Sequence, residues 1–368
     1  MSNLKLTKSS ATDNYSNHLT SSTKNNPLSI YDLLHRPLKD LRISVTDRCN
    51  FRCIYCMPKH IFGPNFKFIQ HQDMLSFEEI TRLTQCFVAL GVTKIRLTGG
   101  EPLLRKDIES LVSSLSNIKT LSGSPLDLTM TTNGSALINK AQALFNAGLK
   151  RITLSLDAID NDVFMKINGV AYPVDRILNA IEQALKIGFS PIKVNAVIRK
   201  GMNENQILPL VRYFRHTPII LRFIEYMDAG STNGWNEHQI IPSAQIQKII
   251  HNAYPIEAIK ANYMGETAKR WRYKDGGGEL GIISSITEPF CADCTRIRLS
   301  TDGKIYPCLF ATKGLDLRSL IRSHCSDHHI IQTIIEFWKQ RSHQYSKLRQ
   351  KQSVSLKEQK IEMHYIGG

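Results

Sequence analysis

The sequence has no long apolar run. None of its 368 residues belongs to a stretch approaching the ~20 uninterrupted apolar residues that a membrane-spanning helix needs, so we expect a soluble protein. Acidic residues are also scarce, because 32 Asp and Glu stand against 47 Lys and Arg, for a formal net charge of +15 at pH 7. This imbalance indicates an anionic partner, which a nucleic acid, a membrane surface or a phosphorylated small molecule would each satisfy.

The first 28 residues hold almost no large apolar side chain, and no arginine precedes Arg36. The first absence argues against a secretory signal and the second against a mitochondrial one, so we expect a cytoplasmic protein. Ser, Thr, Asn and Lys dominate residues 1–28, and a segment of this composition cannot offset its ordering entropy, which predicts a disordered tail. Near the other end of the chain, we interpret Lys339, Arg341 and the basic residues after them as a solvated surface.

The eight cysteines are not dispersed as a disulfide framework requires. Six fall into two tight groups, which is typical of metal binding in a reducing compartment: Cys49, Cys53 and Cys56, and then Cys291, Cys294 and Cys308. Each group lacks a fourth cysteine. A closed zinc site needs four ligands, whereas three thiolates can hold a cubane iron–sulfur cluster and leave one iron open. Zinc with a histidine as fourth ligand remains an alternative, chiefly for the second group. We interpret Cys86 and Cys325 as structural.

Short β-rich runs alternate with amphipathic helical patterns from residue 41 onward. The predicted strands are 41–46, 94–98, 126–131, 151–156, 192–198 and 219–225. The predicted helices are 77–90, 106–118, 137–147, 161–167, 174–187 and 204–216. Repeated strand–helix units predict an α/β fold with a parallel sheet and right-handed crossovers, and six units suggest a partial barrel. Functional residues are then expected at the carboxyl ends of the strands.

Polar residues follow five of the predicted strands, at 98–102, 131–134, 155–157, 195 and 225–228. One such segment is usually only a turn. Five of them at equivalent positions, in a chain that carries a cysteine triad, predict a site at that end of the barrel.

The first cysteine group resembles the signature of the radical S-adenosylmethionine (SAM) enzymes. Its spacing is C-x3-C-x2-C followed by Met57 and Pro58, and residues 99–102 resemble the GGEP motif of that family. The resemblance implies a partial (β/α)6 barrel and a [4Fe-4S] cluster whose open iron binds SAM. One-electron cleavage of SAM then yields a 5′-deoxyadenosyl radical. It also implies that SAM is bound by Tyr55, Gly100, Ser155 and Met227.

The pair of three-cysteine groups resembles, more narrowly, the GTP 3′,8-cyclase family within the radical SAM enzymes. The shared motifs are the run 290–299, the turn 302–304 before Cys308, and the terminal Gly367 and Gly368, and the resemblance runs from residue 41 to the C-terminus. It implies a second [4Fe-4S] cluster in a C-terminal region, 235–368, after a barrel at 29–234. It also implies a lyase that catalyses the first step of molybdenum cofactor biosynthesis. The radical would remove the ribose 3′ hydrogen of GTP, and the carbon radical would attack guanine C8 to give (8S)-3′,8-cyclo-7,8-dihydroguanosine 5′-triphosphate.

The same resemblance assigns substrate and catalytic residues. The GTP contacts it implies are Arg42, Arg96, Thr131, Lys193, Arg222, Arg296, Ile297 and Arg298. The catalytic residues it implies are Arg296, Arg298, Gly367 and Gly368, the two glycines ending a tail that returns to the active site. The chemistry of the arginines agrees, because a buried guanidinium is costly without an anion and its planar fork suits phosphate oxygens. Of Lys94 and Arg96, we expect only one to enter the barrel.

The resemblance implies several partners besides GTP and SAM. They are a reductase or flavodoxin-type electron donor, a downstream cyclic pyranopterin monophosphate synthase and a second copy of the chain in a homodimer, with no membrane and no nucleic acid. Two alternatives remain open. One is another radical SAM enzyme with an auxiliary cluster, acting on a peptide or RNA, although peptide-modifying members usually carry more than three cysteines in the extension. The other is a basic zinc-containing nucleic-acid-binding protein whose cysteines are structural.

Overall fold

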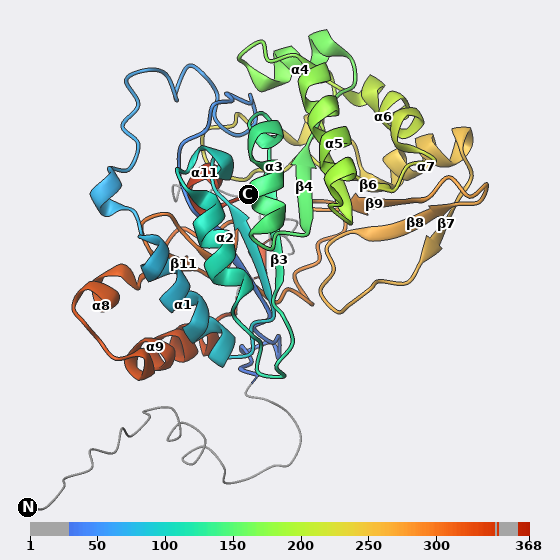
Figure 1. The fold of residues 1–368 in the computed structure, drawn as a ribbon. Helices are drawn as coiled ribbons and strands as arrows, with labels where there is room; N and C mark the ends of the chain where they lie inside the picture. Colours follow the sequence, from blue (N-terminus) through green and yellow to red (C-terminus); the bar gives the residue numbers. More distant parts are fainter. Residues whose placement is uncertain (1–28, 343, 346–359) are drawn as a thin grey trace, which may run out of the picture.

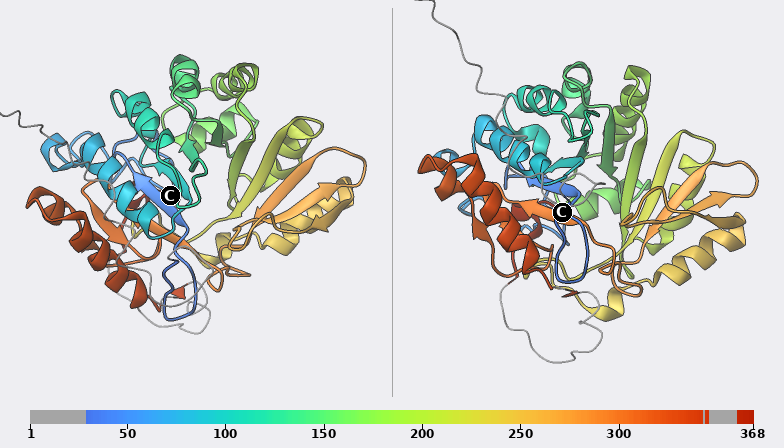
Figure 2. Two further views of the ribbon diagram at one scale, coloured as in Figure 1. Left: turned by 60° about the horizontal axis from the view of Figure 1, so that its bottom comes forward. Right: turned by 90° about the horizontal axis from the view of Figure 1, so that it is seen from below.

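The computed structural model describes residues 29–342, 344–345 and 360–368, so the predicted tail at 1–28 lies outside the described residues. Twelve strands form one sheet, in which the six central strands run parallel in chain order. These strands are β1 (Asp40–Ser44), β2 (Lys94–Thr98), β3 (Asp127–Thr132), β4 (Arg151–Ser155), β5 (Ile192–Ile198) and β6 (Ile219–Glu225). Each lies within two residues of a predicted strand, and the sheet curves into a partial barrel with helices on its outer face (Figures 1 and 2).

The helices between these strands also lie where the sequence predicts them. They are α1 (Phe77–Ala89), α2 (Ile108–Ser116), α3 (Leu137–Asn146), α4 (Asn161–Asn168), α5 (Val174–Ile187) and α6 (Ile207–Phe214), with 3-10 turns at His71–Asp73, Pro102–Leu104 and Glu204–Gln206. α1 begins with a capping box in which the Ser76 side chain accepts from the Glu79 N–H and the Glu79 side chain accepts from the Ser76 N–H. Cys86 on α1 belongs to the hydrophobic core, as predicted.

The last third of the chain extends both edges of the barrel sheet. On one edge, β9 (Glu279–Ile283) pairs in parallel with β6, and β8 (Lys269–Tyr273) and β7 (Ile256–Ile259) follow outward. On the other edge, β10 (Arg296–Leu299) pairs in parallel with β1, and β11 (Lys304–Tyr306) and β12 (Leu315–Asp316) follow. The remaining elements are α7 (Ser243–Ala253), the 3-10 turn Glu237–Gln239, α8 (Arg318–Arg322), α9 (Asp327–Lys339) and α11 (Met363–Ile366). The boundary at 234/235 stays a prediction.

The sheet is apolar toward the helices and polar toward the inside of the barrel. Along β5, Ile192, Val194 and Ala196 are fully buried in the core, whereas Asn195 points to the barrel interior, since successive side chains on a strand alternate. The same alternation places Arg42 of β1 and Arg96 of β2 inside the barrel. The apolar face of the sheet is therefore covered by the helices, and charged and hydroxyl side chains line the inside of the barrel. No helix in the described part of the chain combines the length and apolar character needed to cross a membrane.

Candidate active site

A cavity of about 320 Å³ lies inside the barrel, and all six cysteines of the two groups line it. The topology places the two groups at opposite ends of neighbouring strands. Cys49 follows the carboxyl end of β1, whereas Cys294 precedes the amino end of β10, which runs parallel to β1 with Arg296 opposite Asp40. β11 runs antiparallel to β10, so Cys308 just after it returns to the end where Cys294 lies. The cavity thus has one cysteine group at each end.

The first cysteine group forms a tight turn after β1, and its three cysteines are partly buried. The carbonyl of Cys53 accepts from the backbone N–H of Cys56 at 3.0 Å, and the Cys49 sulfur accepts from the Phe51 N–H at 3.4 Å. Burial raises the pKa of Cys49 to about 12, and burial together with the neighbouring Cys49 thiolate also raises the pKa of Cys53 and of Cys56. Such thiols lose their protons when a metal takes the protons' place.

Zinc and a cubane cluster demand different arrangements of these cysteines. Among the described residues, no three His, Cys, Asp or Glu side chains gather as ligands of a single ion. A zinc ion needs that arrangement, whereas a cubane cluster binds each cysteine through a different iron. Both cysteine groups fit the cluster better than the ion.

The four predicted SAM residues come together at the first group. Tyr55, Gly100, Ser155 and Met227 all line the cavity, and the Tyr55 hydroxyl donates to Asp157 Oδ2 at 2.6 Å. Glycine at 100 has a packing reason, because an added Cβ would overlap the carbonyl of Arg48 in the loop that leads to the cysteines. The GGEP segment therefore packs directly against the cysteine loop.

The sequence reading missed a buried carboxylate next to the first group. Glu101 accepts hydrogen bonds from Thr132 Oγ1 at 2.6 Å, from the Asn133 N–H at 2.7 Å and from the Leu103 N–H at 3.0 Å. It joins the end of β2 to the end of β3. In the sequence, the position of Glu101 inside the GGEP motif, next to apolar residues, was the feature that could have indicated a buried carboxylate. Asp157 after β4 is similarly buried, and burial raises its pKa to about 6.

Glu101 predicts a dependence of stability on pH. Burial raises its pKa from 4.5 to about 7, so its protonated form is favoured in the folded chain. This contribution is present at acidic pH and is lost as the pH rises through 7. In urea unfolding of the metal-free protein, the free energy of unfolding of the wild type relative to Glu101→Gln should fall between pH 5 and pH 8. A difference that stays constant over this range would contradict the assignment.

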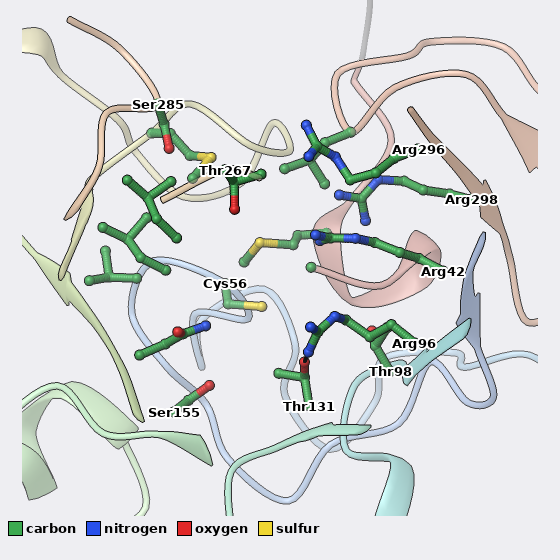
Figure 3. A pocket seen from close by; sticks show the side chains of 18 of the residues that line it. Arg42, Cys56, Arg96, Thr98, Thr131, Ser155, Thr267, Ser285, Arg296 and Arg298 are labelled. Atoms are coloured by element: carbon green, nitrogen blue, oxygen red, sulfur yellow. Dashed lines mark hydrogen bonds between the residues drawn. The ribbon is translucent and has the colours of Figure 1, made fainter. Parts of the chain in front are cut away.

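Three arginines stand side by side across neighbouring strands in the middle of the cavity. Arg298 of β10 is opposite Arg42 of β1, which is opposite Arg96 of β2, and Figure 3 shows all three pointing into the cavity. Like charges directly opposite destabilise a sheet. Burial, and then the charge of Arg298, lower the pKa of Arg42, and its buried Nε has no hydrogen-bond partner among the described residues. A bound anion would therefore stabilise the row.

Other predicted substrate residues surround this row. Arg96 donates to Thr131 Oγ1 at 2.9 Å, and Arg222 and Arg296 also line the cavity. Burial, with Arg222 next, lowers the pKa of Lys193 to about 7, which places Lys193 in the same basic cluster although it is not among the cavity-lining residues. The side chain of Ile297 lies in the hydrophobic core, so only its main chain is available to a ligand.

The structure corrects two expectations from the sequence. Lys94 and Arg96 both line the cavity, because residues two apart on a strand share a face, so the expectation that only one would enter was wrong. Arg341, interpreted as part of a solvated surface, is 3% exposed and donates to the sulfur of Cys294 at 3.1 Å. Although burial alone would raise it, the pKa of Cys294 is lowered to about 7 by the charges of Arg296 and Arg341.

The C-terminal tail returns into the barrel. Gly368 lines the cavity, and the carbonyl of Ile366 accepts from Arg298 NH1 at 3.4 Å. Both views of Figure 2 place the C-terminus within the curve of the sheet. Gly367 has φ +73, and an added Cβ there would overlap the side chain of Thr98. The two glycines thus lie beside the arginine row.

Comparison with known proteins finds related sequences over nearly the whole chain. The model of the Radical SAM superfamily matches residues 43–214, and the model named Molybdenum Cofactor Synthesis C matches residues 219–347. The GTP 3′,8-cyclase of Acidothermus cellulolyticus is 46% identical over 362 residues, and that of Staphylococcus carnosus is 46% identical over 341 residues. In each case the match covers 92% of this chain and 99% of the relative.

Solved structures agree on the fold. Streptococcus suis SuiB bound to S-adenosylmethionine matches with a TM-score of 0.56 at 17% identity, over 83% of this chain and 70% of that one. SuiB bound to its precursor peptide SuiA gives a TM-score of 0.57 at 16% identity, over 85% of this chain and 66% of that one. At such low identity these matches show the shared barrel architecture alone.

Proposed function

The chain belongs to the GTP 3′,8-cyclase family of radical SAM enzymes, and we propose that it converts GTP to the 3′,8-cyclised nucleotide of the first step of molybdenum cofactor biosynthesis. A single cavity supports this proposal, because it has a cysteine group at each end and, between them, a row of three arginines that form no ion pair with a carboxylate among the described residues. This arrangement suits SAM and a nucleoside triphosphate bound together. The open iron of the first cluster would bind SAM, that of the second would bind the base, and the arginines would bind the phosphates.

The residues at each end fit the cofactors. Cys49, Cys53 and Cys56 would hold the first cluster, and Cys291, Cys294 and Cys308 the second. Tyr55, Gly100, Ser155 and Met227 would bind SAM. When bound, the first cluster supplies the electron that splits SAM to a 5′-deoxyadenosyl radical, which removes the ribose 3′ hydrogen and so starts the attack on guanine C8.

The arginine row would bind the triphosphate and hold the ribose toward SAM. Arg42, Arg96 and Arg298 would contribute most, with Thr131, Lys193 and Arg222 on the adjoining strands and the segment 296–298 toward the second cysteine group. The phosphates would neutralise the positive charges that face one another in this row. Guanine would then lie at the second group, and the ribose between the two groups.

Gly367 gives a prediction for the tail. Alanine at 367 would force a left-handed backbone on a residue with a Cβ and push that Cβ into Thr98, displacing Gly368 from the cavity. A displacement of about 1 Å costs about 100-fold in rate when reacting groups must be aligned, so we expect a fall of that order in kcat for GTP.

Gly123 supplies the matched control for this substitution. It has φ +78 and no atom within 4 Å of an added Cβ, so Gly123→Ala imposes the same kind of backbone strain without a clash. Product formation at saturating GTP compares the two variants. Equal activity of Gly367→Ala and Gly123→Ala would refute a role for the tail.

Partners beyond the two small molecules belong to this proposal. A reductase or flavodoxin-type protein would supply the electron, a downstream cyclic pyranopterin monophosphate synthase would take the product, and the chain would act as a homodimer in the cytoplasm. The basic cavity accounts for part of the positive charge without a nucleic acid or a membrane.

Anaerobic turnover tests the proposed function. The reconstituted protein is incubated with dithionite and SAM, and 5′-deoxyadenosine is measured with and without GTP. Strong stimulation by GTP, with a cyclised guanosine triphosphate as product, supports the proposal. SAM cleavage that GTP leaves unchanged would refute the substrate, and tightly held zinc without SAM cleavage would refute the radical enzyme.

A further inference from the structure

Two buried arginines hold the main chain around the second cysteine group. Arg36 NH1 donates to the carbonyl of Cys291 at 2.8 Å, and Arg341 NH1 donates to the carbonyl of Cys294 at 2.8 Å. Arg341 NH2 also donates to the Cys294 sulfur at 3.1 Å, and its Nε donates to the carbonyl of Pro307 at 3.2 Å. Since Cys308 follows Pro307, these two guanidiniums contact the backbone at or next to all three cysteines.

Asp32 joins the two arginines. Its Oδ2 accepts from Arg36 Nε at 2.6 Å and from Arg341 NH1 at 2.9 Å, and its Oδ1 accepts from the Leu34 and Arg36 N–H groups, both at 2.9 Å. Both carboxylate oxygens are therefore engaged. The aspartate comes from the segment before β1 and Arg341 from just after α9, so the contact fixes these two segments to the cysteine loop.

The rest of the surroundings fixes the orientation of Arg341. Its guanidinium lies 4.5 Å from the centroid of the Trp338 ring, and Trp338 Nε1 donates to the carbonyl of Arg36 at 3.2 Å. Arg36 and Arg341 also line the cavity together with the three cysteines. The two guanidiniums thus have several contacts with the protein and line the cavity beside the three cysteines.

Positive charge is concentrated in this group. The guanidiniums of Arg36 and Arg341 share the carboxylate of Asp32, and all three side chains are at most 2% exposed. Buried guanidiniums are stabilised by nearby negative charge, which three cysteine thiolates on a cluster would add. Positive charge and N–H···S hydrogen bonds favour the reduced, more negative form of a cluster.

We propose that Asp32, Arg36 and Arg341 are positioning residues that hold the second cysteine group in place for its cluster and raise the reduction potential of that cluster. The inference rests on the second cluster of the proposed function. If the wild-type protein binds only one cluster, the proposed function fails and this inference fails with it, whereas two clusters in the wild type that the variants leave unaltered would overturn the inference alone.

The test compares Arg341→Gln, Arg341→Lys and Asp32→Asn with the wild type after anaerobic reconstitution. Arg82→Gln is the matched control, because Arg82 also donates to an aspartate, Asp327, and to a cysteine carbonyl, Cys325, but away from the cavity. Iron and sulfide content, and the midpoint potential of each cluster by EPR-monitored titration, are measured.

The wild type and Arg82→Gln should each hold about eight iron atoms per chain, whereas Arg341→Gln should hold about four, all of them in the first cluster. Arg341→Lys and Asp32→Asn should keep part of the second cluster. In Arg341→Lys the potential should fall by at least the equivalent of a tenfold change in the redox ratio, about 59 mV for one electron. The potential of the first cluster should not move.

The three variants together keep the proposal open to refutation. If Arg341→Gln loses both clusters, the two milder variants decide the outcome. Full iron content with an unchanged potential of the second cluster in Arg341→Lys and Asp32→Asn would overturn the proposal.

Discussion

Alanine in place of Cys56 is expected to abolish both SAM cleavage and GTP conversion, whereas alanine in place of Cys294 is expected to abolish GTP conversion alone. The two cysteines belong to groups at opposite ends of the cavity, and each group would hold its own cluster. SAM needs the first cluster only. The Cys294 variant should therefore keep the slow, GTP-independent formation of 5′-deoxyadenosine at the wild-type rate, within about twofold.

The measurement is 5′-deoxyadenosine and nucleotide product from the same anaerobic reaction, with iron content as the check on cluster loading. Cys86→Ala is the control, since Cys86 lies on α1 and packs in the hydrophobic core away from the cavity. The folded fraction of this variant should retain both activities. Loss of SAM cleavage in the Cys294 variant, with the first cluster still bound, would show that the two groups do not act separately.

Methionine in place of Arg42 is expected to change ligand binding and stability in opposite directions. Truncating one partner of a buried charge pair costs about 2–5 kcal/mol, so the Kd for GTP should rise about 30-fold or more. Without GTP, the same substitution removes the central charge of a row of three adjacent arginines. The free protein should then be more stable by up to about 1 kcal/mol.

Arg272→Met is the matched control for Arg42→Met. Arg272 lies on a strand too, but its side chain is exposed and paired with Glu257, so neither GTP binding nor stability should change measurably. GTP binding by calorimetry and thermal unfolding without ligand supply the two values. If Arg42→Met destabilised the free protein and bound GTP normally, Arg42 would be a structural residue.

The barrel could be predicted from the sequence because its signals are local. Each strand and helix from β1 to β6 carries its own hydrophobic period and end signals, and a parallel sheet follows from their alternation. The pairing of β10 with β1 has no such signal, since about 250 residues separate the partners. The position of the second cysteine group opposite the first depends on that pairing.

The parts of the site that belong to short sequence motifs could be predicted from the sequence. The parts that depend on contacts between distant segments could not. The first cysteine group and the GGEP segment are each a short continuous motif in the sequence. The role of Arg341 depends on contacts with Asp32 and Cys294, which lie 309 and 47 residues earlier in the chain, so the sequence alone indicated only a surface charge. Glu101 was overlooked because its role, accepting three hydrogen bonds between two strand ends, depends on the register of β2 and β3.

In the proposed function, GTP lies along the cavity with its ribose toward the SAM end and its base toward the second cysteine group. Turnover of GTP deuterated at the ribose 3′ position tests this most directly, with mass analysis of the 5′-deoxyadenosine formed. The layout of the arginine row and the two cysteine groups predicts one deuterium in the 5′-deoxyadenosine. 5′-Deoxyadenosine without deuterium, formed in step with the nucleotide product, would contradict this orientation of GTP.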